Sequence, residues 1–142
     1  MTPVHSIVLA CVALALLTAI VALRMLQVRV REMREKRIHP QQIATSPQAA
    51  ARFQSVQASD NYRNLFEMPV LFYVLCALLL ATGSASGFFA AGAWIYVLLR
   101  VVHSAIQCTY NKVLHRFVVF GTSFVVLVVL WARFGIHIAQ LG

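Results

Sequence analysis

Two short runs of polar residues interrupt a chain that otherwise consists largely of apolar side chains. The first is Arg63-Asn64-Leu65-Phe66-Glu67-Met68-Pro69. Side chains three and four positions apart lie on one face of a helix, so Arg63 and Asn64 are expected beside Glu67. Pro69 cannot donate the hydrogen bond of a regular helical turn, which predicts a kink next to Glu67. A polar ligand site is one interpretation of this run, and an Arg63–Glu67 ion pair that only neutralises itself is the other.

The second run lies on a later segment, with polar residues at steps of three, four and three: Arg100, His103, Gln107 and Tyr110. This spacing predicts a single polar stripe along a helix. Inside a membrane a charged side chain costs about 2.5–3.5 kcal/mol on insertion scales, so Arg100 needs a partner or a function. His103 is either part of a polar site or a buried histidine that hydrogen-bonds a neighbouring helix.

Two further arginines are expected at the same depth as these runs. Arg29 lies near the end of the first apolar segment, and Arg116 lies at the start of the last one. Together they predict a cationic, hydrogen-bonding pocket among the helices, suited to an anionic, peptide-like molecule from the cytosol and an apolar partner from the lipid. The sequence shows no nucleophilic triad and no glycine-rich phosphate loop. No metal is expected either, because His103 and His115 lack the i,i+4 relation of a zinc-binding helix.

The composition places these residues in a bilayer. Of 142 residues, 61% are hydrophobic and 11% are charged, whereas soluble domains average about half apolar and a quarter charged. The length excludes a separate catalytic domain, a dinucleotide-binding fold and a repeat array. Long uncharged runs and a turn at 82–87 predict one domain over 1–142. We expect an all-α, integral membrane four-helix bundle with helices over 4–25, 62–82, 87–110 and 115–135.

The distribution of charge predicts the topology. The net charge of +8 is explained by basic connections between the helices, so nucleic acid is not expected as a partner. By the positive-inside rule both charged connections, including the loop 38–60, face the cytoplasm, and both termini face the other side of a bacterial inner membrane or an organelle membrane. The stretch Arg29–Arg37 is expected to continue the first helix beyond the bilayer and to contact anionic lipids. A flexible linker follows, which could become helical from Pro47.

Three segments resemble the MAPEG family, the membrane-associated proteins in eicosanoid and glutathione metabolism. They are Gln27–Arg31, Arg63–Pro69 and Arg100–His103. In motif they are closest to the family's microsomal prostaglandin E synthase and microsomal glutathione transferase branches. The resemblance extends over essentially the whole chain in helix number and topology. It implies a homotrimer in which glutathione, as cosubstrate, lies in a U-shape between subunits.

The resemblance also implies roles for individual residues. It gives Arg116 the catalytic role of stabilising the glutathione thiolate, because a nearby guanidinium lowers the pKa of a thiol and makes it a better nucleophile. The Glu67 carboxylate would accept the ligand's ammonium group, and an arginine fork would hold its carboxylates. The residues expected to bind glutathione are Arg29, Arg63, Asn64, Glu67 and His103, together with Arg100, Gln107 and Tyr110 on the same stripe.

Two positions depart from the pattern of prostaglandin E synthase. Gln107 stands where that branch has a tyrosine, and Phe117 stands where it has a serine; Tyr110, one turn beyond Gln107, could substitute in part. Two functions therefore stay open. The first is a glutathione-dependent transferase or peroxidase acting on a hydrophobic or lipid electrophile. The second is a non-enzymatic lipid-binding or scaffold protein of the same fold, in which Arg116→Ala would leave binding intact.

Overall fold

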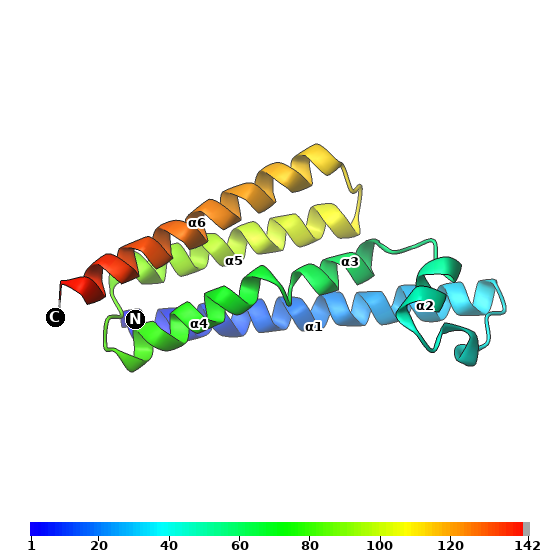
Figure 1. The fold of residues 1–142 in the computed structure, drawn as a ribbon, viewed down its shortest axis with the longest axis horizontal. Helices are drawn as coiled ribbons and strands as arrows, with labels where there is room; N and C mark the ends of the chain where they lie inside the picture. Colours follow the sequence, from blue (N-terminus) through cyan, green and yellow to red (C-terminus); the bar gives the residue numbers. More distant parts are fainter. Residues whose placement is uncertain (141–142) are drawn as a thin grey trace.

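The computed structural model describes residues 1–140, apart from the side chains of Ser46 and Ala50, and this part of the chain is helical and contains no strand (Figure 1). In chain order the elements are α1 (Pro3–Glu35), the 3-10 helix η1 (Pro40–Ile43), α2 (Ser46–Arg52), α3 (Gln57–Asn64), α4 (Met68–Ala81), α5 (Gly87–Cys108) and α6 (Val113–Ala139).

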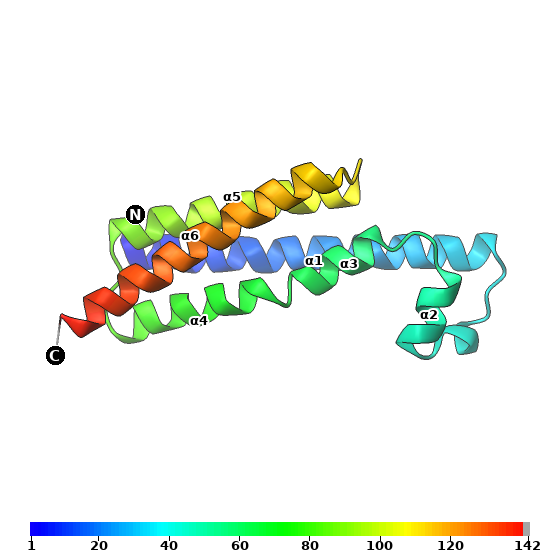
Figure 2. The same cartoon turned by 45° about the horizontal axis from the view of Figure 1, so that its top comes forward.

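Within residues 1–140, four helical segments are long and apolar enough to cross a membrane: α1, α3 with α4, α5 and α6. The expected all-α membrane architecture is therefore confirmed. The segments run alongside one another, with the N-terminus and the turn at 82–86 at one end of the bundle (Figure 1). The other end, called here the loop end, carries η1, α2 and the turn between α5 and α6. At the loop end α1 extends well past that turn (Figure 2).

The first helix is longer than its apolar part, as the interspersed charges predict. It begins at Pro3, where the Thr2 hydroxyl accepts a hydrogen bond from the backbone N–H of His5. It continues to Glu35 because oppositely charged side chains one turn apart support its last turns. Arg31 Nε donates to Glu35 Oε1 at 2.8 Å. The following linker contains α2, which begins one residue before Pro47.

The second span is broken where the sequence predicts a kink. A single helix over 62–82 is expected, yet the structure contains α3 and α4, separated by Leu65–Glu67. Pro69 lies in the first turn of α4, where its missing N–H costs no hydrogen bond. The kink next to Glu67 is thus confirmed, and it is sharp enough to end one helix and begin another. The helix before it starts at Gln57, five residues earlier than expected.

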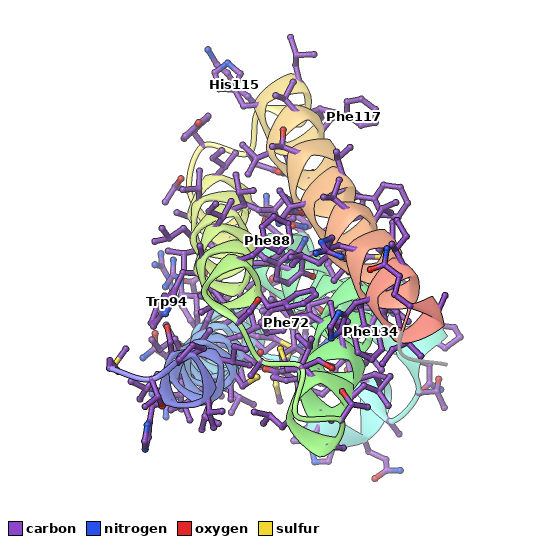
Figure 3. The ribbon with its side chains drawn as sticks, turned by 90° about the vertical axis from the view of Figure 1, so that its left-hand side faces the viewer. Phe72, Phe88, Trp94, His115, Phe117 and Phe134 are labelled. Atoms are coloured by element: carbon purple, nitrogen blue, oxygen red, sulfur yellow. The ribbon has the colours of Figure 1, made fainter. Side chains whose placement is uncertain are left out.

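The interior of the bundle is closely packed. Phe72 of α4 stacks on Tyr96 of α5, with ring centroids 4.8 Å apart, and both side chains are fully buried. Figure 3 shows Phe72 in the interior between the helices. On α5, a Cβ atom at Gly92 would lie only 2.5 Å from Leu130 Cδ2, so glycine permits the close approach of α6. Apolar side chains also cover the outside: Leu16 and Ile20 of α1 are 59% and 63% exposed, as expected for surfaces that face lipid.

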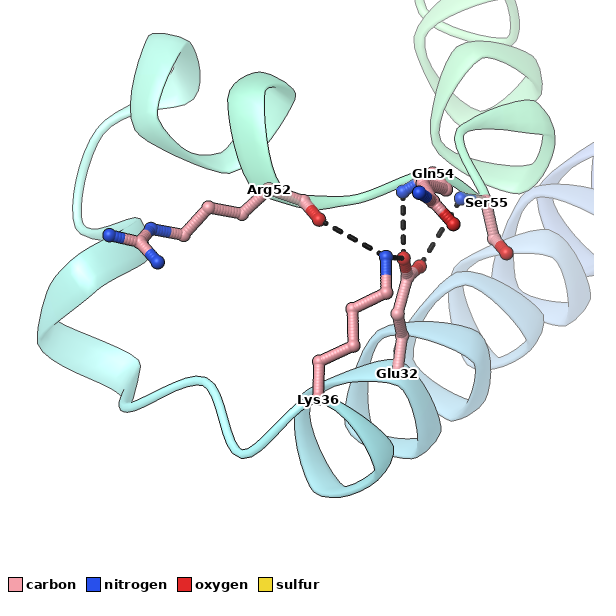
Figure 4. A network of polar contacts seen from close by, with 5 residues as sticks. All are labelled: Glu32, Lys36, Arg52, Gln54 and Ser55. Carbon is pink, nitrogen blue, oxygen red and sulfur yellow. Dashed lines mark hydrogen bonds and ion pairs between the residues drawn. The ribbon is translucent and has the colours of Figure 1, made fainter.

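At the loop end, a buried carboxylate fastens the connecting segment to α1 (Figure 4). Glu32, only 6% exposed, accepts hydrogen bonds from the backbone N–H groups of Gln54 at 2.7 Å and Ser55 at 3.2 Å. Lys36 Nζ lies 2.6 Å from the same carboxylate and donates to the carbonyl of Arg52. One acidic side chain thereby satisfies two main-chain donors and fixes where α3 begins.

The Glu32→Gln variant tests this attachment. We expect protection of the Gln54 and Ser55 amides from hydrogen–deuterium exchange to fall about 10- to 100-fold, because hydrogen bonds to a charged group contribute about 1.5–3 kcal/mol. Glu35→Gln is the matched control, since in the described part of the chain Glu35 pairs only with the largely exposed Arg31. Equal exchange in the two variants would contradict the attachment.

Candidate ligand site

A cavity of about 480 Å³ opens between α3, α5 and α6 on the side of the helix break, and it is called here the main cavity. This volume suits a small molecule. Three helices and the break supply its wall, which consists of a charged and polar part and an apolar part. The lining residues are Asp60, Arg63, Asn64, Glu67, His103, Gln107, Val113, Arg116, Phe117 and Phe120.

The charged groups of the main cavity are balanced in number. Arg63 and Arg116 supply two guanidinium groups, and Asp60 and Glu67 supply two carboxylates. Arg63 and Glu67 form no ion pair within 4 Å in the described residues, where the ion pairs are those of Glu32 and Glu35. The self-neutralising pair considered from the sequence is therefore wrong, because the break separates Glu67 from the helix that carries Arg63. Both side chains remain available to a ligand.

Hydrogen bonds of amide and hydroxyl side chains join α3 to α5 beside the main cavity. Asn64 Nδ2 donates to Gln107 Oε1 at 3.3 Å. His103 is 2% exposed, and its Nδ1 has no hydrogen-bond partner in the described residues. One turn before Asn64, the fully buried Asn61 accepts a hydrogen bond from Ser104 Oγ at 3.3 Å. These contacts hold the polar faces of α3 and α5 together.

The α6 side of the main cavity carries the predicted catalytic arginine and most of the apolar lining. Arg116, in the first turn of α6, donates from Nη1 to Oδ1 of Asn111 at 3.1 Å, in the turn that precedes the helix. Asn111 has a φ of 46°, in the left-handed region that asparagine tolerates better than most residues. Phe117, 71% exposed, projects outward at the start of α6 (Figure 3). A polar ligand and an apolar one could therefore meet beside Arg116.

Arg29 lines a neighbouring cavity of about 380 Å³, called here the side cavity, together with the loop residues that cover α1. Its Nη2 donates to Ser59 Oγ at 2.9 Å, and its guanidinium lies over the ring of Phe53. Asp60 and Arg63 line both cavities. Within this single chain, Arg29 thus shares the side cavity with Arg63 but does not line the main cavity.

Two further predicted residues lie outside the main cavity. Tyr110 is 55% exposed, and its hydroxyl contacts His115 Nδ1 at 3.2 Å. The spacing predicts that Tyr110 continues the stripe of Gln107. This prediction is wrong, because α5 ends at Cys108. Arg100 does lie on α5, but it is fully buried behind the cavity wall.

One charged residue that lines the main cavity was not predicted from the sequence. Asp60 lines both cavities, and its position one turn before Arg63 and Asn64 is the signal that could have indicated it. Within residues 1–140, no group of three or more His, Cys, Asp or Glu side chains is placed to hold a metal ion.

Comparisons with known proteins bear on the family of the chain. Comparison with curated proteins gives no significant match, and comparison with solved structures gives none either. The model of the MAPEG family matches residues 7–136. Since this match covers nearly the whole chain, the protein belongs to the MAPEG family.

Proposed function

We propose that the protein is a glutathione-dependent membrane transferase or peroxidase that acts on a hydrophobic or lipid electrophile. The observation that carries the proposal is the convergence of Arg63, Glu67 and Arg116 on one cavity whose other side is apolar. Family membership supports a function related to glutathione. In this proposal the loop end of the bundle faces the cytosol, from which glutathione enters.

The charges of the main cavity fit the groups of glutathione, which has two carboxylates, one ammonium and one thiol. Arg63 can bind a carboxylate in bidentate fashion, and Glu67 can accept hydrogen bonds from the ammonium. Arg116 would stabilise the thiolate, which is the nucleophile for an electrophilic carbon or a hydroperoxide oxygen. The apolar side chains near Arg116 would hold the second substrate.

A homotrimer is part of this proposal. The outer faces of α1 and α6 are apolar along much of their length, with exposed residues such as Leu23 and Val125 that could face lipid or a second copy. Contacts between copies would also explain why Arg29 does not reach the main cavity of its own chain. Light scattering of the detergent-solubilised protein, corrected for bound detergent, measures the number of chains: three supports this part of the proposal, and one contradicts it.

Lipid binding without chemistry is the second candidate function. It is favoured by Gln107, whose side-chain oxygen is already engaged by Asn64 and which offers no hydroxyl group to a thiol. In this case a fluorescent fatty acid would bind to wild-type protein and to Arg116→Ala with equal affinity, while glutathione would have no effect on either protein.

Calorimetric titration of glutathione into the detergent-solubilised protein tests the proposed function. We expect saturable binding and an ultraviolet difference signal of the thiolate. S-Methylglutathione is the control, because it retains the charged groups but cannot form a thiolate, so it should bind without the ultraviolet signal. Absence of heat at millimolar glutathione would exclude the enzyme and leave the lipid-binding candidate.

A further inference from the structure

Arg100 is the most deeply buried charged side chain of the described residues, and it adjoins the main cavity without lining it. Arg100, near the middle of α5, has no exposed surface. Of the ion pairs in the described part of the chain, none includes Arg100, and its Nε and Nη1 atoms have no hydrogen-bond partner there. An ionisable residue at this depth in a membrane protein is costly, and it usually serves function.

The contacts that Arg100 does make are to the back of the main cavity. Its Nη2 donates to the main-chain oxygen of Asn64 at 3.3 Å. Its guanidinium carbon lies 5.6 Å from the ring centroid of Phe120 on α6, within the range of a cation–π interaction. Asn64 and Phe120 both line the main cavity, whereas Arg100 does not. One buried cation therefore touches two walls of the cavity from behind.

The carbonyl that Arg100 binds is one of those that the helix break leaves without a main-chain hydrogen bond. Asn64 is the last residue of α3, and the chain then turns through Leu65–Glu67 before α4 begins. The backbone N–H groups of Leu65 and Phe66 bond to carbonyls of residues before Asn64. A carbonyl without a partner inside a membrane protein is unfavourable, and a cation at a helix C-terminus is favourable. Arg100 gives this carbonyl a hydrogen-bond donor and also places a cation at the C-terminus of α3.

From this geometry, and resting on the proposed function, we infer that Arg100 is a positioning residue for glutathione. By binding the Asn64 carbonyl, it holds the break between α3 and α4 in the shape that directs Asn64 and Glu67 into the main cavity. It thus acts on the ligand through the backbone, without touching it. The effect of Arg100 on binding therefore depends on Glu67.

The test compares Arg100→Met, which removes both charge and donor, with Arg100→Lys, which keeps a cation able to reach the carbonyl. We expect glutathione affinity to fall about 10-fold in Arg100→Met and to recover largely in Arg100→Lys. In the double variant with Glu67→Gln, the two losses should be less than additive, because both act on one contact. Ser104→Ala is the control. The Ser104 hydroxyl also joins α5 to α3, through its hydrogen bond to Asn61, but it does not touch the break.

A second measurement needs no ligand. Hydrogen–deuterium exchange at the Leu65 and Phe66 amides should accelerate in Arg100→Met and stay slow in Arg100→Lys and Ser104→Ala. Unchanged exchange, unchanged glutathione affinity, or strictly additive losses with Glu67→Gln would each overturn the inference. If wild-type protein bound no glutathione, the proposed function would fail, while the exchange measurement would still decide whether Arg100 holds the break. Arg100→Lys keeps the inference testable if Arg100→Met does not fold.

Discussion

Replacing Arg116 with alanine is expected to abolish the thiolate signal of bound glutathione and to lower turnover by at least about 100-fold. The guanidinium lines the main cavity at the start of α6, beside the apolar side chains that would hold the second substrate. Without it, the thiol keeps its ordinary pKa and is a poor nucleophile at neutral pH. Ultraviolet difference spectroscopy and turnover of a generic aryl halide electrophile measure the two effects.

The contact between Arg116 and Asn111 calls for a separate control, because the alanine variant also removes that hydrogen bond. Asn111→Gly deletes the acceptor while tolerating the left-handed backbone, so it should retain the thiolate. Arg133→Ala removes an exposed arginine from the same helix and should behave like wild type. A thiolate signal that persisted in Arg116→Ala would refute the catalytic role.

The Glu67→Gln variant is expected to bind glutathione about 10- to 100-fold more weakly. A charge-assisted hydrogen bond between carboxylate and ammonium contributes about 1.5–3 kcal/mol, which corresponds to this range. Calorimetry with N-acetylglutathione, which lacks the ammonium group, identifies the partner. Wild-type protein should lose affinity for the acetylated ligand, whereas Glu67→Gln should bind both ligands equally.

Asp60→Asn is the matched variant, because Asp60 is the other carboxylate of the main cavity. If Glu67 binds the ammonium, Asp60→Asn should still discriminate between glutathione and its acetylated form. If instead Asp60→Asn lost this discrimination and Glu67→Gln retained it, the assignment of the two carboxylates would be reversed.

Much of the fold could be predicted from the sequence, because the features that decide it are local. Long uncharged runs indicate the spans, and Pro69 indicates the break. Alternating charges of Arg31 and Glu35 indicate that α1 continues past its apolar part. Each of these signals acts within one or two helical turns, so the residues alone carry the information.

The details of the site depend on distant contacts, which spacing cannot reveal. Tyr110 leaves the stripe because α5 ends at Cys108, two residues before it. Arg29 lies in the side cavity because the loop that covers it is fastened by Glu32 through backbone groups more than twenty positions away. For Arg100, helical spacing predicts the face of α5 on which the side chain lies. It does not predict whether the side chain lines the cavity or is buried outside it.

The apolar side of the main cavity, with Phe117 largely exposed at the start of α6, has a consequence for how a substrate is supplied. In the proposed function this side opens to the bilayer, so a hydrophobic substrate reaches Arg116 by lateral diffusion and not from water. The rate then depends on the mole fraction of substrate among the lipids. Inert lipid added at constant total substrate would slow the enzyme by surface dilution, although nothing in the aqueous phase had changed.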